Sequence, residues 1–183
     1  MIHHADNLFI VTGAPGAGKT TLLDAAAGDG FQVGKEAARA VIQSQAAIDG
    51  PAVQWRHPAM FAELMLDRDI QNWQSLRDHA GPVLCDRGIP DLVAFGRMLA
   101  LPDTGHFSRA ATLYRYNPTV FFAPPWRDIY TDDAERTEGW DHAQRIYGPM
   151  RDVYVELGYR VVELPRAPVA ERLAFVKDAI THA

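Results

Sequence analysis

The fold of this chain is decided by one stretch near its start, Leu8-Phe9-Ile10-Val11-Thr12-Gly13-Ala14-Pro15-Gly16-Ala17-Gly18-Lys19-Thr20. Its first four residues are apolar and include the β-branched Ile and Val, which predicts a short buried strand. Residues 13–20 then match the pattern G-x-x-x-x-G-K-[ST]. Residues 20–27 predict a helix that ends at Gly28. A strand, a glycine-rich turn and a helix therefore follow one another without a break.

The pattern at residues 13–20 predicts a phosphate-binding loop. The backbone N–H groups of such a loop point at phosphate oxygens, and the N-terminus of the following helix adds partial positive charge. Lys19 can reach the β- and γ-phosphates, and the Thr20 hydroxyl can ligate Mg²⁺. A glycine-rich turn that matches by chance is the alternative, but the flanking strand and helix are what the motif requires. We expect ATP and Mg²⁺ to bind here, with these nucleotide-binding residues: Gly13, Ala14, Pro15, Gly16, Ala17, Gly18, Lys19, Thr20 and Thr21.

Composition places the chain among soluble globular proteins. Its 183 residues fit one domain, expected to span residues 1–183, and 48% of them are hydrophobic. The net charge of −5 weighs against nucleic-acid binding, because such domains are usually basic. No apolar run is long enough to cross a membrane, and the residues at the start lead us to expect no signal peptide. The single cysteine, Cys85, excludes an intrachain disulfide, so we expect a cytoplasmic protein.

Four more short apolar runs predict strands, and helical patterns separate them. The expected strands lie at 31–33, 83–85, 120–122 and 159–164, and the expected helices lie at 36–48, 59–80, 89–101, within 102–117, at 133–157 and at 169–180. Gly148-Pro149 is expected to break or kink the helix at 133–157. Five strands that alternate with helices predict an α/β fold whose parallel sheet is covered on both faces.

Charged residues follow the second and third expected strands. Asp86 ends the third strand, where a carboxylate can meet Mg²⁺ or its water shell; a helix cap before the next helix is the alternative. Arg87 stands where a hydrolytic ATPase commonly has a glutamate, which favours transfer to a bound acceptor that Arg87 helps to hold. Glu36 is either the general base for an acceptor hydroxyl or an exposed first-turn residue. Arg39 either binds an anionic group of the substrate or is solvated.

The segment around residues 124–147 carries several arginines among acidic residues. Phosphoryl transfer builds negative charge, which an arginine from a mobile segment can neutralise. Arg127 and Arg136 are the candidates, and an ordinary charged helix with internal ion pairs is the alternative. Pro165-Arg166-Ala167, directly after the fifth strand, is expected to border the nucleotide base.

Taken together, the chain resembles the predicted AAA-type ATPase/kinase-like family of small phosphate-loop proteins, which is related to ribosylnicotinamide kinases and more loosely to nucleoside kinases. The resemblance rests on motifs along the whole chain: 9–21, Glu36-Ala37-Ala38-Arg39, Asp86-Arg87-Gly88, Trp126-Arg127, 133–137, Leu157-Gly158-Tyr159 and Glu171-Arg172. It implies a P-loop NTPase three-layer sandwich with strand order 2-3-1-4-5 and a lid around 124–147. It also implies phosphate contacts by residues 13–20, a magnesium or catalytic role for Asp86, a base role for Glu36 and lid roles for the two arginines.

These motifs favour a kinase that transfers the γ-phosphoryl group of ATP to a small-molecule acceptor. Two alternatives stay open, a non-catalytic nucleotide-dependent switch or adaptor and a simple ATPase. The chain has no Asn-Lys-x-Asp motif of the kind that reads guanine in small GTPases. Neither the acceptor nor the oligomeric state follows from the sequence.

Overall fold

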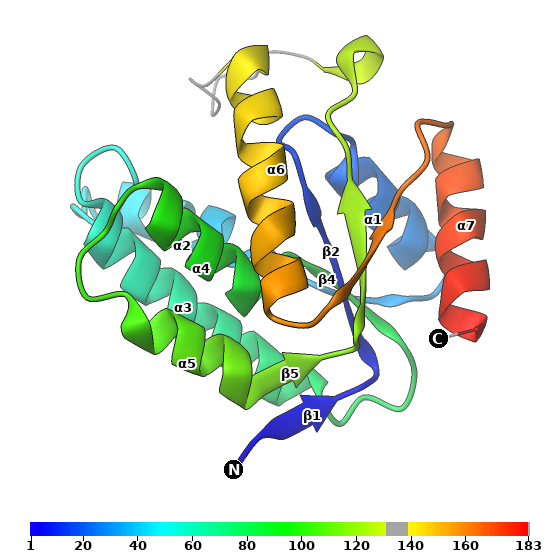
Figure 1. Cartoon of the computed structure of the whole chain (residues 1–183), viewed down its shortest axis with the longest axis horizontal. Helices are drawn as coiled ribbons and strands as arrows, with labels where there is room; N and C mark the ends of the chain where they lie inside the picture. Colours follow the sequence, from blue (N-terminus) through cyan, green and yellow to red (C-terminus); the bar gives the residue numbers. More distant parts are fainter. Residues whose placement is uncertain (131–138, 183) are drawn as a thin grey trace.

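Five parallel strands form the main sheet of the computed structural model, which describes residues 1–130 and 139–182 (Figure 1). They lie in the order β3-β4-β2-β6-β7. Counted along the chain as the five expected strands, this is the order 2-3-1-4-5. Their bounds are β2 (Leu8–Gly13), β3 (Gln32–Gly34), β4 (Val83–Asp86), β6 (Thr119–Ala123) and β7 (Arg160–Glu163).

The central position of β2 brings several strand ends to the glycine-rich turn. In the register of the sheet, Val11 lies opposite Asp86 of β4, and Gly13 lies opposite Ala123 of β6. All three strands run in the same direction, so their carboxyl ends meet at one edge of the sheet. Ligands of open α/β sheets bind at this edge.

Helices cover both faces of the sheet, which makes three layers (Figure 1). Along β2 the side chains alternate: Leu8 and Ile10 join one core cluster, whereas Phe9 and Val11 join the other. The second cluster packs against α1 and α7, and the first packs against α2 to α6. The bounds are α1 (Lys19–Gly28), α2 (Ala37–Ala47), α3 (Pro58–Leu76), α4 (Ile89–Met98), α5 (Gly105–Leu113), α6 (Trp140–Glu156) and α7 (Val169–Thr181), with a short 3₁₀ helix η1 (Arg127–Ile129) before α6.

A second, two-stranded sheet was not predicted. It pairs β1 (His3–Ala5) with β5 (Tyr114–Tyr116), so the architecture differs in this detail from the expected single sheet. The region 102–117 therefore holds both α5 and a strand. This sheet contacts α3 through aromatic rings: Tyr114 of β5 lies edge-on to the buried Trp73, with 5.3 Å between the ring centroids.

Of the break or kink expected at Gly148-Pro149, the break does not occur, because α6 continues through Pro149. Ala143 before the proline and Met150 and Val153 after it are all buried. Packing on both sides of Pro149 therefore holds one helix together despite the backbone hydrogen bond that a proline cannot donate. Of the expected helix at 133–157, residues 133–138 lie outside the described residues.

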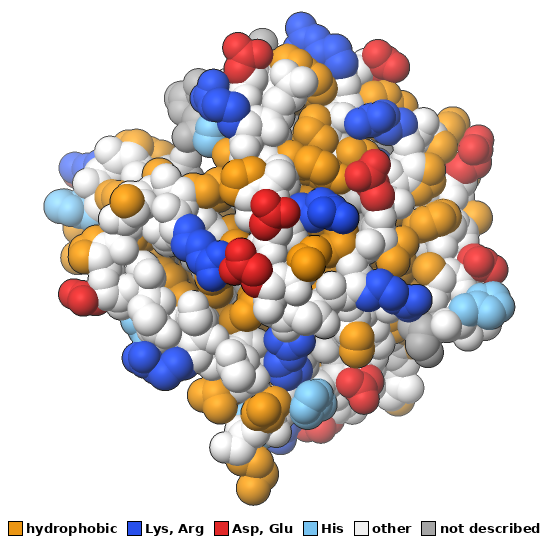
Figure 2. Space-filling model, viewed as in Figure 1, with side chains coloured by type: hydrophobic (Ala, Val, Ile, Leu, Met, Phe, Trp, Pro, Cys, Tyr) orange, Lys and Arg blue, Asp and Glu red, His pale blue; other side chains and the backbone are white. Residues whose placement is uncertain are grey.

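The surface shows no large area of one charge on the face seen in Figure 2, where acidic and basic side chains are interspersed with apolar ones. Within residues 1–130 and 139–182, none of the helices has both the length and the apolar character needed to cross a bilayer.

Candidate active site

The glycine-rich turn between β2 and α1 has a backbone that only glycine adopts easily. Gly13, Gly16 and Gly18 have φ angles of 120°, 70° and 72°. A Cβ atom on Gly13 would lie 2.2 Å from the Ala123 carbonyl oxygen of β6. The Ala14 N–H donates to the same oxygen at 3.0 Å, which fixes the start of the turn against the neighbouring strand. The turn therefore has the backbone features that a phosphate-binding loop needs.

Lys19 is the first residue of α1, and its side chain folds back over the turn. Its Nζ donates hydrogen bonds to the carbonyl oxygens of Gly13 at 3.3 Å and Ala14 at 2.7 Å. Burial, together with the nearby Arg87 guanidinium, lowers the pKa of Lys19 to about 7, although Asp86 and Glu36 act in the opposite direction. A bound phosphate would give this ammonium the anionic partner that favours its charged form.

Asp86 is the last residue of β4 and lies beside the turn. Its carboxylate is a candidate ligand for a cation. Among the described residues no side chain or backbone group donates a hydrogen bond to it. Burial, with the added repulsion from Glu36, raises its pKa to about 6. It does not cap α4, because the N-cap is Gly88, whose N–H is accepted by Asp91 at 3.1 Å. Thr20, in the first turn of α1, is exposed.

Arg87, which follows β4, makes hydrogen bonds to Glu36, which follows β3, and to Asp91 of α4. Its Nε donates to Glu36 Oε1 at 3.1 Å, and its Nη1 donates to Asp91 Oδ1 at 3.1 Å. Nη1 also lies 3.3 Å from Thr12 Oγ1. Nη2 makes no hydrogen bond to the part of the chain that the structure describes. Arg87 itself adopts a left-handed φ of 66°, a strained conformation that aims its side chain across the sheet edge.

Glu36 lies at the start of α2 and faces inward. Burial acts to raise its pKa, but the charge of Arg87, followed by Lys19, outweighs burial and the pKa is lowered. Only 24% of its side chain is exposed, so it is not a solvated first-turn residue. Arg39 lies at the rim of the site: its Nε is 4.0 Å from Glu36 Oε2, and 46% of its side chain is exposed.

Asp91 is a central residue of the site that the sequence reasoning missed. Its carboxylate accepts hydrogen bonds from the Thr12 hydroxyl, Arg87, the Gly88 N–H and the Tyr154 hydroxyl of α6. It is 7% exposed. The available signal was its position three residues after Gly88, where the carboxylate of a first-turn acid can accept the N-cap N–H.

Asp69 of α3 is a second missed residue. It is 6% exposed, and burial, increased by the charges of Asp91 and Glu36, raises its pKa well above the usual range. It stands three residues after Leu66 and four before Trp73, so it lies on the apolar stripe of the helix. An acidic residue on the apolar stripe of a helix was the sequence signal that could have identified Asp69.

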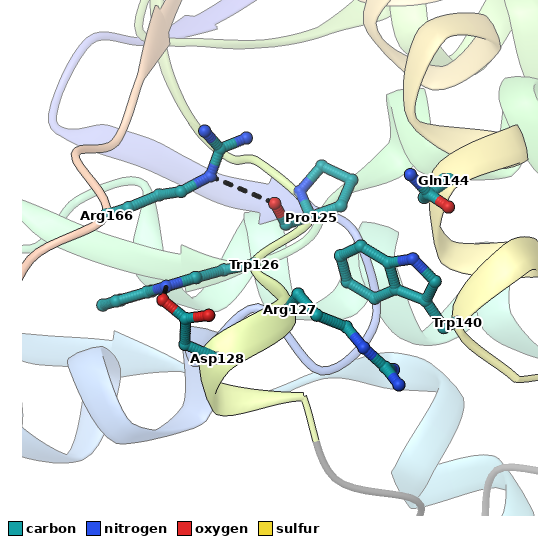
Figure 3. Close-up of a pocket in the computed structure, with 7 residues that line it drawn as sticks. All are labelled: Pro125, Trp126, Arg127, Asp128, Trp140, Gln144 and Arg166. Atoms are coloured by element: carbon teal, nitrogen blue, oxygen red, sulfur yellow. Dashed lines mark hydrogen bonds between the residues drawn. The ribbon is translucent and has the colours of Figure 1, made fainter.

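An open cleft of about 530 Å³ lies after the carboxyl ends of β6 and β7, and β6 is the neighbour of the strand that leads into the turn (Figure 3). The Arg127 guanidinium lies over the Trp140 ring, 5.3 Å from its centroid, and the Arg166 Nε donates to the Pro125 carbonyl at 3.1 Å. The lining residues come from the segment after β6, the start of α6 and the segment after β7: Pro125, Trp126, Arg127, Asp128, Trp140, Gln144 and Arg166. Arg127 and Arg166 thus line one cleft, whereas Arg136 lies outside the described residues.

Comparison with known proteins gives one family and a set of structures with the same fold. A family model described as an AAA domain matches residues 8–172, whereas no curated protein matches the chain. The NadR protein, solved in complex with NR, is similar with a TM-score of 0.75 and 19% identity, over 97% of this chain and 51% of that one. The chain therefore spans about half the length of that protein.

Deoxyadenosine kinase from M. mycoides also has this fold. Its structure with dCMP and dCDP gives a TM-score of 0.71 at 11% identity, over 96% of this chain and 100% of the kinase. Its structure with dATP gives 0.62 at 12% identity, over 95% and 98% of the two chains.

Proposed function

The chain belongs to the AAA domain family, whose model spans residues 8–172, and from this premise we propose that it is a kinase that transfers the γ-phosphoryl group of ATP to a small-molecule acceptor. One observation carries the proposal. The loop lysine, a carboxylate without a hydrogen-bond donor and a paired base and arginine meet at one sheet edge; they are Lys19, Asp86, Glu36 and Arg87. The fold shared with a deoxyadenosine kinase supports it.

The nucleotide is proposed to extend from the loop into the cleft beside it. The backbone N–H groups of residues 13–20 and the Lys19 ammonium hold the phosphates. The cleft offers two indole rings, Trp126 and Trp140, and the guanidinium groups of Arg127 and Arg166, which suit the flat face of a base. The loop and the cleft are close to each other, because a Cβ on Gly18 would lie 3.0 Å from Ile129 of η1, the short helix that also carries Arg127.

Asp86 and Thr20 would hold Mg²⁺. The Asp86 carboxylate lacks a hydrogen-bond donor among the described residues, and burial and the charge of Glu36 raise its pKa. A bound cation would stabilise the ionised carboxylate against both effects. Thr20 is an exposed residue on the first turn of α1. When bound, the ion neutralises phosphate charge that grows during transfer.

Glu36 is proposed to act as the general base. The lowered pKa keeps it ionised, so it can accept the proton of an acceptor hydroxyl as the hydroxyl oxygen bonds to the γ-phosphorus. The bond from that phosphorus to the bridging oxygen breaks, and ADP leaves. Arg87 orients Glu36 through its Nε, and its Nη2 is left to bind the acceptor or the transferred group. Arg39, at the rim of the site, is proposed to bind an anionic part of the acceptor.

Arg127 is proposed to neutralise charge in the transition state, since its guanidinium lies in the cleft next to the loop. Arg136 stays a second candidate for this role, and the assignment of residues 124–147 as a lid stays a prediction.

A screen for the acceptor tests the proposal. ADP formation from Mg-ATP would be followed with nucleosides, phosphorylated cofactors and small alcohols, for the wild type, Lys19→Ala and Glu36→Gln. We expect an acceptor that speeds ADP formation by orders of magnitude, with both variants strongly impaired. Phosphate release without any acceptor would instead identify an ATPase. Tight ATP binding without turnover on any acceptor would identify a nucleotide-dependent switch.

A further inference from the structure

Arg172, in the first turn of α7, lies against the outer side of the phosphate loop. Its Nη1 donates to the carbonyl oxygens of Ala17 at 3.1 Å and Gly18 at 3.4 Å, although the two segments are more than 150 residues apart in sequence. A Cβ on Gly18 would lie 2.8 Å from this Nη1, and the φ of 72° at Gly18 also favours glycine. The residue is only 3% exposed.

Among the described residues, no acid balances the charge of Arg172. Within the described residues no carboxylate lies within ion-pair distance of it, and its buried Nε has no hydrogen-bond partner. Burial accordingly lowers its pKa. A buried, unpaired charge is costly, and an apolar residue of similar size is often neutral or stabilising in its place. The two hydrogen bonds to the loop tie α7 to it, but they leave the charge of this buried guanidinium without an anion among the described residues.

The two carbonyls that accept from Arg172 belong to trans peptide groups, so the N–H ends of these groups point away from the guanidinium. The Ala17 carbonyl shares its peptide group with the Gly18 N–H, and the Gly18 carbonyl shares its group with the Lys19 N–H. A cation on the carbonyl side polarises each peptide group and strengthens its N–H as a donor. The positive charge of Arg172 also adds to the potential of the loop.

We infer that Arg172 is a positioning residue for nucleotide binding: it fixes and polarises the Gly18 and Lys19 peptide groups, and the bound polyphosphate balances its charge. The inference rests on the proposed function and deepens it. It assigns to α7 a part in phosphate binding, separate from the cleft that is proposed to take the base.

Calorimetry with two Mg²⁺-loaded titrants, ATP and tripolyphosphate, tests this inference on wild type, Arg172→Met and Arg172→Lys. Arg172→Met should weaken binding of both titrants about tenfold, because the charge acts on phosphates rather than on the base. The melting temperature of ligand-free Arg172→Met should equal or exceed that of the wild type. Arg172→Lys, which keeps the charge, should retain most of the affinity. Lys177→Met, which removes an exposed positive charge from the same helix, is the control and should bind like the wild type.

Wild-type affinity in folded Arg172→Met would overturn the inference and leave the proposed function intact. A purely structural arginine would give the opposite pattern, with a lower melting temperature and unchanged affinity. If Arg172→Met does not fold, Arg172→Gln decides by the same comparison, since it keeps hydrogen-bond donors without charge. Failure of the wild type to bind ATP would refute the proposed function. The titration of ATP into the wild type alone tests this, so the two outcomes can be distinguished.

Discussion

At the scale of single residues, the site consists of groups whose ordinary charge states are disturbed by burial. Lys19 sits where its ammonium form is disfavoured, and Asp86 sits where its carboxylate form is disfavoured. Both disturbances are relieved by the same event, the arrival of phosphate and a cation. The free protein therefore holds the site in a state that a ligand can stabilise strongly.

Nucleotide binding should be coupled to proton uptake at Lys19. With a pKa of about 7, most of this side chain is neutral in the free protein at pH 8, and bound phosphate restores the ammonium form. Binding of ADP in EDTA at pH 8 should then take up about one proton. The measurement is calorimetry in Tris and in HEPES, whose ionisation enthalpies differ. An observed binding enthalpy that is the same in both buffers would contradict the expectation.

Asp86→Asn should stabilise the metal-free protein at high pH only. Folding raises the pKa of Asp86 to about 6 from an ordinary value of 3.8, so the folded state holds this proton more tightly than the unfolded state. Stability is therefore lost as the pH rises from about 4 through about 6. The variant avoids that loss, so its melting temperature in EDTA should exceed that of the wild type above pH 6 and match it near pH 4. A difference that does not change with pH would argue against the raised pKa.

At the scale of elements, close contact between β2 and β6 explains why the loop must begin with glycine. Gly13→Ala combines a φ of 120° with a Cβ 2.2 Å from backbone of β6. We expect the variant to lose at least about 2 kcal/mol of unfolding free energy and most of its nucleotide affinity. Gly28→Ala, where a Cβ meets nothing within 4 Å at the end of α1, is the control and should be stabilising by about 0.5–1 kcal/mol. Denaturant unfolding measures both.

The α6 helix is tied to the site through one buried hydroxyl. Tyr154 donates to Asp91, which also accepts from Arg87. Tyr154→Phe should cost about 1–2 kcal/mol of unfolding free energy and lower kcat more than it raises KM, because Arg87 loses part of its support. Tyr147→Phe makes the same change in the same helix, at a hydroxyl bonded to exposed Glu163, and should cost less than about 0.5 kcal/mol. Equal effects of the two substitutions would contradict a special role for Tyr154.

At the scale of the whole molecule, the sheet and the loop were predictable because their signals are local. Apolar runs such as 83–85 and 120–122 are buried on both faces, and residues 13–20 carry their own pattern. The residues that organise the site interior were missed for the opposite reason. Asp91 and Asp69 acquire their roles only when α4, α3 and α6 pack together, and β1 with β5 pairs segments from distant parts of the chain.

The central claim, that the backbone of residues 13–20 binds the phosphates of a nucleotide, is tested most directly by amide chemical shifts. Mg-ATP would be titrated into ¹⁵N-labelled protein. We predict large, saturable shifts of the amides of Gly16, Gly18 and Lys19, with the β1–β5 sheet unchanged. Loop amides that do not move at millimolar Mg-ATP would contradict the account.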